Sequence, residues 1–286
     1  MPSLLRVVLL APPPLLLGLL AAAAAADTTT PQQQRSTNSG GPKPHDPRRF
    51  DLVNPCLNRS SAPGRMPWCN PTLPLASRID DMIARMTVPE KIASMGSDKN
   101  AIPSLGLPNY NWRSEAEHGI EYATFDSLTP FSTSFAFPIT TAMAFNRTLY
   151  RAIGAQVGAE ARALANVGNA ESTFWTPVIN LAREPRWGRN FETPGEDPLL
   201  TGEYAAAFVQ GFQDSPVDPS YLQASACCKH YDANSVESST EAGVKHTRMD
   251  FNANVTMQDL VDSYMPGFQA CVEKGRVSGA CRAAAA

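Results

Sequence analysis

The sequence predicts an α/β fold built on a parallel sheet, because short apolar runs alternate along the chain with segments of helical periodicity. Each run is too short for a helix and is bounded by polar residues, as a buried strand is. Strands that alternate with helices indicate βα units. The predicted strands cover residues 135–137, 174–181, 224–228 and 277–281.

Five further segments have the spacing of amphipathic helices. The clearest covers residues 147–166, where apolar side chains recur every three or four positions. Thr87 and Glu90 form a capping-box pattern at the start of another helix, and Thr256 with Asp259 caps the last. The two remaining predicted helices cover residues 74–85 and 201–212.

The N-terminus has the pattern of a secretory signal peptide over residues 1–26. Arg6 gives a positive start, residues 7–20 are almost wholly apolar, and small residues follow where a peptidase would cut. A membrane anchor is the alternative, but three prolines break the run and the remainder is too short to span a bilayer. Residues 27–49, rich in Thr, Gln, Ser and Pro, are predicted to be a flexible linker. We therefore expect a secreted protein, extracellular or in the cell wall.

Composition narrows the class of partner. The chain has 286 residues, 43% of them hydrophobic, and a net charge of −3. No basic stripe suggests nucleic acid, and we expect a soluble protein with a neutral partner and no membrane association. Secretion predicts glycosylation, and three sequons begin at Asn58, Asn146 and Asn254.

The six cysteines do not have the spacing of a zinc site, so no metal is expected. Cys56 and Cys69 flank a loop rich in Pro, Ser and Asn and are a possible disulfide. Cys227 and Cys228 lie in an apolar run, and we predict that they are buried thiols.

Polar and aromatic residues cluster at the ends of the predicted strands, where parallel α/β folds bind ligands. The clusters are 110–119, 183–192 and 229–232. Charged groups such as Glu115 suit sugar hydroxyls, and Trp112 or Trp187 could supply a flat wall. The candidate hydroxyl-binding residues are Glu115, Arg189, Lys229 and His230.

Each cluster has a plainer interpretation. Arg183, Glu184, Arg186 and Glu192 would form surface salt bridges. The Lys-His pair would be structural, and Glu117 would belong to a solvated face. Three such clusters on one chain favour a binding site over three separate coincidences.

These motifs resemble glycoside hydrolase family 3, and most closely its plant and fungal β-xylosidase branch. The long motif Arg-Glu-Pro-Arg-Trp-Gly-Arg over 183–189 is followed by Gly-Glu-Asp-Pro over 195–198. Residues 114–119, Ser-Glu-Ala-Glu-His-Gly, and 228–231, Cys-Lys-His-Tyr, resemble two further motifs of the family, and 86–91 resembles its early helix start.

The resemblance implies a (β/α)8 TIM-type barrel followed by an α/β sandwich domain. It implies retaining exo-hydrolysis of β-linked xylose from xylo-oligosaccharides or arabinoxylan, without a cofactor. Glu115, Arg189, Lys229 and His230 would bind the hydroxyls of the terminal sugar. Glu115 stands where β-glucosidases have Asp, and it would crowd the space of a glucose hydroxymethyl group, which favours a pentose. β-Glucosidase and α-arabinofuranosidase remain alternatives.

The sequence departs from the family at its C-terminal end. Residues 50–282 are expected to form a partial barrel of about five βα units, and 283–286 are an alanine tail outside the family pattern. The sandwich domain, the nucleophile and the acid/base are expected to be missing, so no catalytic residue is assigned. A catalytically inactive sugar-binding fragment and a non-functional truncated product are the further alternatives.

Overall fold

The computed structural model describes residues 55–282, except 97, 100, 122, 124, 126–129, 242 and 251. The predicted signal peptide (1–26), linker (27–49) and alanine tail (283–286) lie outside the described residues. The first residues of the predicted barrel segment, 50–54, lie outside them as well.

A three-stranded parallel sheet carries the site. Its order is β3 (Thr173–Phe174), β4 (Ser225–Tyr231) and β7 (Gly279–Arg282). Ser114 forms an isolated parallel bridge with Phe174 and so marks a fourth position beside β3. The predicted parallel arrangement is confirmed for these strands, although the described part of the sheet has fewer than the five expected.

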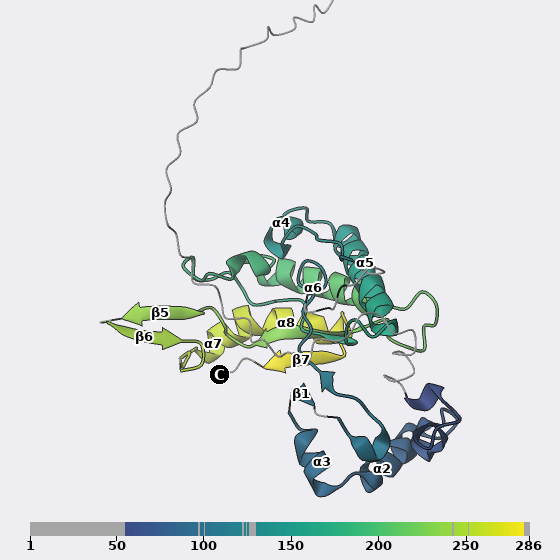
Figure 1. Cartoon of the computed structure of the whole chain (residues 1–286). Coiled ribbons are helices and arrows are strands. Elements are labelled where there is room, and N and C mark those ends of the chain that lie inside the picture. The colour runs from purple at the N-terminus through teal and green to yellow at the C-terminus, as the bar shows by residue number, and fades with distance from the viewer. Residues whose placement is uncertain are drawn as a thin grey trace, which may run out of the picture. The chain divides into compact units, whose positions relative to one another are not determined.

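Three helices provide the crossovers between neighbouring strand positions. They are α5 (Arg147–Asn166), α6 (Pro198–Gln213) and α8 (Met265–Glu273), and they lie side by side (Figure 1). The α5 and α6 backbones approach closely, because a Cβ on Gly154 would stand 2.2 Å from the Phe208 carbonyl oxygen. A continuous apolar core forms between these helices and the sheet.

The helix predictions agree well with the structure. Helix α2 (Leu75–Arg85) and α5 have the expected extents. Helix α3 (Val88–Ala93) begins with the predicted capping box. Helix α6 begins three residues earlier than predicted, because the Asp197 carboxylate accepts from the Leu200 backbone N–H at 2.7 Å and caps it there. No helix among the described residues has the length and apolar character needed to cross a membrane.

The last predicted helix is divided into three parts. A short α7 (Met257–Asp259), capped by Thr256 as predicted, leads through a π-helical segment (Leu260–Tyr264) into α8.

Two strand predictions are wrong in part or in whole. Residues 135–137 form no strand and instead lead directly into α4 (Pro138–Ala142). The predicted strand 174–181 ends at Phe174, and only Val178 bridges to Lys229 beyond it. The reason is that Pro177 has no N–H to donate, so the bonds to β4 are irregular: the Thr176 carbonyl accepts from the Cys227 N–H at 3.1 Å, and the Ile179 N–H donates to the Lys229 carbonyl at 2.8 Å.

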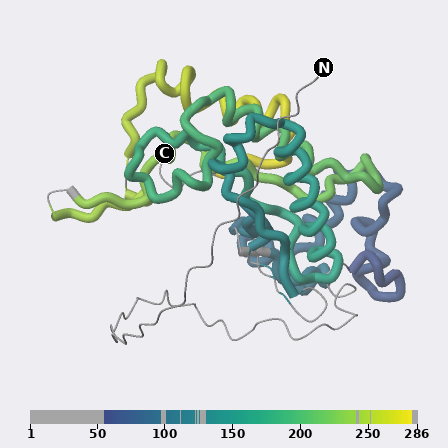
Figure 2. The backbone as a smooth tube through the Cα atoms, turned by 90° about the horizontal axis from the view of Figure 1, so that it is seen from above, coloured from purple at the N-terminus to yellow at the C-terminus, as the bar shows by residue number. Residues whose placement is uncertain are grey.

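Smaller elements surround this core. Three 3₁₀ turns (Pro55–Leu57, Pro63–Arg65 and Pro67–Cys69) precede α2, and a fourth covers Pro103–Leu105. Strands β1 (Asp98–Lys99) and β2 (Tyr110–Asn111) pair antiparallel. Strands β5 (Ser238–Glu241) and β6 (Val244–Thr247) form a hairpin that projects away from the helices in two views (Figures 1 and 2).

All six cysteines are paired in disulfides. Cys56 bonds to Cys69, the pair suggested by the sequence. Cys227 bonds to Cys281, and Cys228 bonds to Cys271, so the prediction of buried thiols is wrong. Successive side chains of a strand point to opposite faces, and this gives the two neighbouring cysteines of β4 different partners, one on β7 and one on α8.

Candidate functional site

A cavity of about 270 Å³ lies where the predicted strand-end clusters meet. Three of the four predicted hydroxyl-binding residues line it: Glu115, Arg189 and Lys229. The fourth, His230, lies next to Arg189 at 3.4 Å. The full lining is Glu115, Glu117, His118, Glu121, Phe137, Arg189, Phe191, Glu192 and Lys229.

Lys229 and Glu115 form a buried ion pair in this cavity. The Lys229 ammonium contacts a Glu115 carboxylate oxygen, and the two side chains are 3% and 23% exposed. Lys229 lies on β4, and Glu115 follows Ser114, which bridges to Phe174 on β3. The parallel sheet therefore brings the two side chains together. Burial raises the pKa of the Glu115 carboxyl, while attraction to Lys229 and Arg189 opposes that rise.

Arg189 is held in position by Glu192. Its Nε and Nη2 atoms donate to the two Glu192 carboxylate oxygens at 2.8 and 2.5 Å, which is a bidentate pair. The 3₁₀ turn Asn190–Glu192 brings the two side chains together. The Asn190 amide donates to the Glu184 carbonyl at 2.8 Å and closes this loop. Arg189 therefore presents a fixed guanidinium to the cavity.

His230 is a neutral, buried group. Burial, and then the charges of Lys229 and Arg189, lower its pKa to about 2. Because Arg189 only donates, the Nε2 atom of His230 accepts at 3.4 Å, and Nδ1 carries the proton toward the Asn180 Oδ1 atom at 3.3 Å. Asn180 also accepts from the His230 backbone N–H and donates to its carbonyl. The interpretation of His230 as a structural residue therefore has support, because its ring contacts Arg189 and does not itself line the cavity.

Glu117 does not belong to a solvated face. It is 7% exposed and lines the cavity beside Glu115. The Val178 backbone N–H donates to both of its carboxyl oxygens, at 2.9 and 3.1 Å, and the Thr176 hydroxyl lies 3.4 Å from one of them. Burial raises the pKa of Glu117 to about 8. The sequence offered no signal for this burial beyond the proximity of Glu115.

Two phenylalanines form the aromatic wall, and neither predicted tryptophan does. Phe137 and Phe191 line the cavity with ring centroids 4.6 Å apart, and His118 packs on Phe137 at 4.1 Å. Trp187 is 3% exposed and buried in the core, and Trp112 is not part of the lining. Phe191 lies within the predicted cluster 183–192, two residues after the arginine motif, whereas the sequence pattern places Phe137 in a strand.

The surface salt-bridge interpretation holds for part of the arginine motif. Arg186 pairs with Glu184 at 2.7 Å, and the Arg186 side chain is 87% exposed. Arg183 stacks over the Tyr264 ring at 4.7 Å. These residues support the loop from outside, and Arg189 and Glu192 face the cavity.

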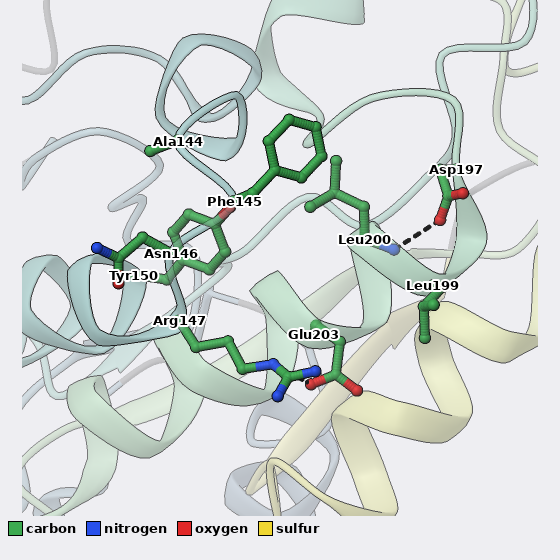
Figure 3. Close-up of a pocket in the computed structure, with 9 residues that line it drawn as sticks. All are labelled: Ala144, Phe145, Asn146, Arg147, Tyr150, Asp197, Leu199, Leu200 and Glu203. Carbon is green, nitrogen blue, oxygen red and sulfur yellow. Dashed lines mark hydrogen bonds and ion pairs between the residues drawn. The ribbon is translucent and has the colours of Figure 1, made fainter.

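A second cavity, of about 850 Å³, lies between the N-terminal ends of α5 and α6 (Figure 3). Arg147 and Glu203 point toward one another there and form an ion pair of 2.8 Å. None of the predicted sugar-binding residues lines it. Asn146 does, and its side chain caps α5 by accepting from the Leu149 N–H at 3.1 Å.

The sequons occupy the surface. The side chains of Asn58, Asn146 and Asn254 are all exposed. Exposure is required for a glycan and does not by itself show one, so glycosylation stays a prediction.

The family model for the glycosyl hydrolase family 3 N-terminal domain matches residues 92–279. The chain belongs to glycosyl hydrolase family 3. Among curated relatives of this family, a β-xylosidase/α-L-arabinofuranosidase from Medicago sativa subsp. varia is 45% identical over 216 residues, which are 74% of this chain and 27% of the relative. The β-D-xylosidase 3 of Arabidopsis thaliana is 44% identical over the same share of each chain.

Solved structures of family 3 enzymes agree. An exo-β-xylosidase in complex with a xylobiose aziridine probe matches with a TM-score of 0.73 and 31% identity, over 83% of this chain and 32% of that one. A β-glucosidase from Thermotoga neapolitana in complex with glucose matches with a TM-score of 0.60 and 26% identity, over 72% of this chain and 29% of that one. The chain thus spans about 27% of the length of the curated relatives. Its relatives are glycosidases, and its family is one of O-glycosyl hydrolases.

Proposed function

We propose that this chain supplies the terminal-sugar half of a β-xylosidase site. The cavity would bind the non-reducing-end xylose of β-linked xylo-oligosaccharides or arabinoxylan. The observation that carries the proposal is the joint presence of two fixed ion pairs, Lys229–Glu115 and Arg189–Glu192, beside an aromatic wall. Charged donors and acceptors suit sugar hydroxyls, and a ring suits the C–H face of a sugar.

Direct binding measurements test this proposal. We expect methyl β-D-xylopyranoside to bind the full chain in calorimetry. Lys229→Met and Arg189→Met should each weaken binding by about tenfold or more, because a hydrogen bond to a charged group contributes about 1.5–3 kcal/mol. Lys245→Met, an exposed lysine on β6, is the matched control and should bind as wild type does. Equal losses in all three variants would contradict the proposed site.

For the reaction we propose the retaining, two-carboxylate mechanism of the family resemblance. We assign neither catalytic role to Glu115 or Glu117, because Lys229 already engages the first and the Val178 N–H the second. The chain alone should then release no product from a chromogenic β-xyloside. Release above that of a Glu115→Ala variant would show that this assignment is wrong.

The choice of sugar is a separate proposal. Glu115→Asp shortens the side chain by one methylene and should improve binding of methyl β-D-glucopyranoside relative to the xyloside. Unchanged relative affinity would remove the argument that Glu115 selects a pentose. An α-L-arabinofuranoside is the second candidate ligand, since the name of one relative includes that activity. Competition between methyl α-L-arabinofuranoside and the xyloside would reveal it.

We also propose that the protein is secreted to the extracellular space or cell wall and glycosylated. Support comes from the N-terminal sequence pattern and from the exposure of the three sequon asparagines. Expression in a eukaryotic secretory host should give a product whose electrophoretic mobility changes with peptide N-glycosidase. A product retained in the cells without any such change would contradict both parts.

A further inference from the structure

Glu117 lines the cavity but, unlike the other carboxyl groups there, forms no ion pair with a described residue. Lys229 pairs with Glu115, and Arg189 pairs with Glu192 and lies 3.8 Å from a Glu237 carboxylate oxygen, so both cations of the cavity already have carboxylate partners. At the rim, Glu121 lies 3.5 Å from His118. Among the described residues no cation forms an ion pair with Glu117, which is nonetheless buried. An unpaired buried carboxylate is costly, and such a group holds its proton instead.

Glu117 also ties together the two segments that build the cavity. Its carboxyl accepts from the Val178 N–H, and Val178 bridges to Lys229 on β4. On its own side, the neighbouring Ala116 carbonyl accepts from the Thr176 hydroxyl at 3.1 Å. Together with the backbone bond from the Trp175 N–H to the Ser114 carbonyl at 2.8 Å, these contacts hold the loop that carries Glu115 against the segment beside Lys229.

We propose that Glu117 is a positioning residue of the site, which keeps Lys229 paired with Glu115 while it holds its proton and weakens sugar binding when it loses that proton. This rests on the proposed sugar-binding function. A charged Glu117 would compete with Glu115 for Lys229 and would place a third negative charge beside Glu115 and Glu192. The contacts that Glu115 and Lys229 offer to a sugar would change, although Glu117 itself need not touch the ligand.

The groups that face Glu117 set the pH at which this happens. Lys229 on β4 favours its charged form, and the Val178 N–H does the same. Burial disfavours the charged form of Glu117 most. The negative charges of Glu192, in the 3₁₀ turn, and of Glu115, two residues before Glu117, disfavour it as well. Tyr204 on α6 is buried nearby, and the charge of Glu117 raises the pKa of that phenol further. The balance puts the pKa of Glu117 at about 8.

The test is the pH dependence of xyloside affinity. If only protonated Glu117 supports binding, the apparent Kd for methyl β-D-xylopyranoside in the wild type should be about tenfold higher at pH 9 than at pH 6. Glu117→Gln keeps an uncharged acceptor of the same shape, so its Kd should vary less than about twofold over that range. Glu273→Gln on the exposed side of α8 is the control and should keep the wild-type profile. A Gln variant with the wild-type pH profile would overturn the proposal.

A second measurement does not depend on the sugar. The Val178 amide resonance in wild type should shift with a midpoint near pH 8, together with a ¹³C carboxyl signal that is missing in Glu117→Gln. A carboxyl midpoint below pH 6 would overturn the inference about Glu117. Failure of the xyloside to bind at any pH, with both midpoints near 8, would instead overturn the proposed sugar and leave the assignment of the proton to Glu117 supported. A single cooperative melting transition of Glu117→Gln at pH 6 shows that the variant folds.

Discussion

Two buried side chains next to Lys229 hold protonation states that oppose one another in their effect on stability. Glu117 keeps its proton to about pH 8, so the free energy of unfolding falls as pH rises from its ordinary pKa of 4.5 to about 8. His230 stays neutral down to about pH 2, so its contribution rises with pH from about 2 to its ordinary pKa of 6.5. Between pH 4.5 and 6.5 the opposite pH slopes of the two contributions cancel.

Single substitutions should separate these contributions. Relative to wild type, the stability of Glu117→Gln should rise with pH between 4.5 and 6.5, by about 1 kcal/mol per pH unit. His230→Gln should show the opposite slope, because the Glu117 contribution remains. Urea unfolding at half-unit pH steps measures both. Variant curves that run parallel to wild type through this window would contradict the two pKa assignments.

At this scale the sequence predicts which residues come together better than it predicts their surroundings. Glu115, Arg189 and Lys229 reach one cavity because each lies at a strand end or in the loop after it. The burial of Glu117 depends on which way the turn closed by the Glu115–Glu121 bridge faces, and local sequence does not decide that. The same holds for Phe137, whose ring meets Phe191 only through tertiary packing.

The pairing of α5 with α6 relies on glycines that let the two backbones approach. A Cβ on Gly154 would stand 2.2 Å from the Phe208 carbonyl oxygen, and one on Gly211 would stand 2.1 Å from the Arg151 carbonyl oxygen. Backbone atoms cannot turn aside as a side chain would, so any added methyl must push the helices apart.

Gly154→Ala should therefore destabilise the protein, although alanine favours a helix by about 1 kcal/mol relative to glycine. Overpacking typically costs about 1–3 kcal/mol, and here it must exceed the gain in propensity. Gly96→Ala is the control, because no atom lies within 4 Å of its Cβ position. Urea denaturation of both variants checks this, and a Gly154→Ala protein as stable as wild type would mean that the helices are not packed this closely.

Periodicity predicted the long helices because their apolar faces repeat over many turns. It failed for residues 135–137, since three apolar residues in a row fit a strand, a loop or a helix start equally well. Residues 174–181 form a shorter strand than predicted because Pro177 has no N–H for a regular ladder, although the Thr176 carbonyl and the Ile179 N–H still bond to β4.

On the scale of the whole molecule, an apolar stripe on α2 is open to solvent. Leu75, Ile79 and Ile83 repeat every four residues along one side of this helix, and they are 66%, 45% and 47% exposed. On α3, Val88 and Ile92 are 67% and 65% exposed. Patches of this kind promote association in water.

We expect the chain to self-associate with rising concentration, and Ile79→Lys to weaken that association by about tenfold, since burying an isoleucine contributes about 1.5–3 kcal/mol. Ser77→Lys adds the same charge to α2 away from the stripe and should change association little. Sedimentation velocity over a range of concentrations compares the two. Identical behaviour of both variants would exclude the stripe as the contact.

The neighbouring cysteines of β4 have a consequence for how the chain is connected. The bond from Cys228 to Cys271 closes a loop that lies inside the loop closed by Cys227 and Cys281. The chain from Cys228 to Cys271, which includes the projecting β5–β6 hairpin, is therefore an inner covalent loop enclosed by the outer loop from Cys227 to Cys281. A protease that cut the hairpin would open the inner loop without releasing either piece, and both halves would remain joined beside the sheet through two covalent bonds.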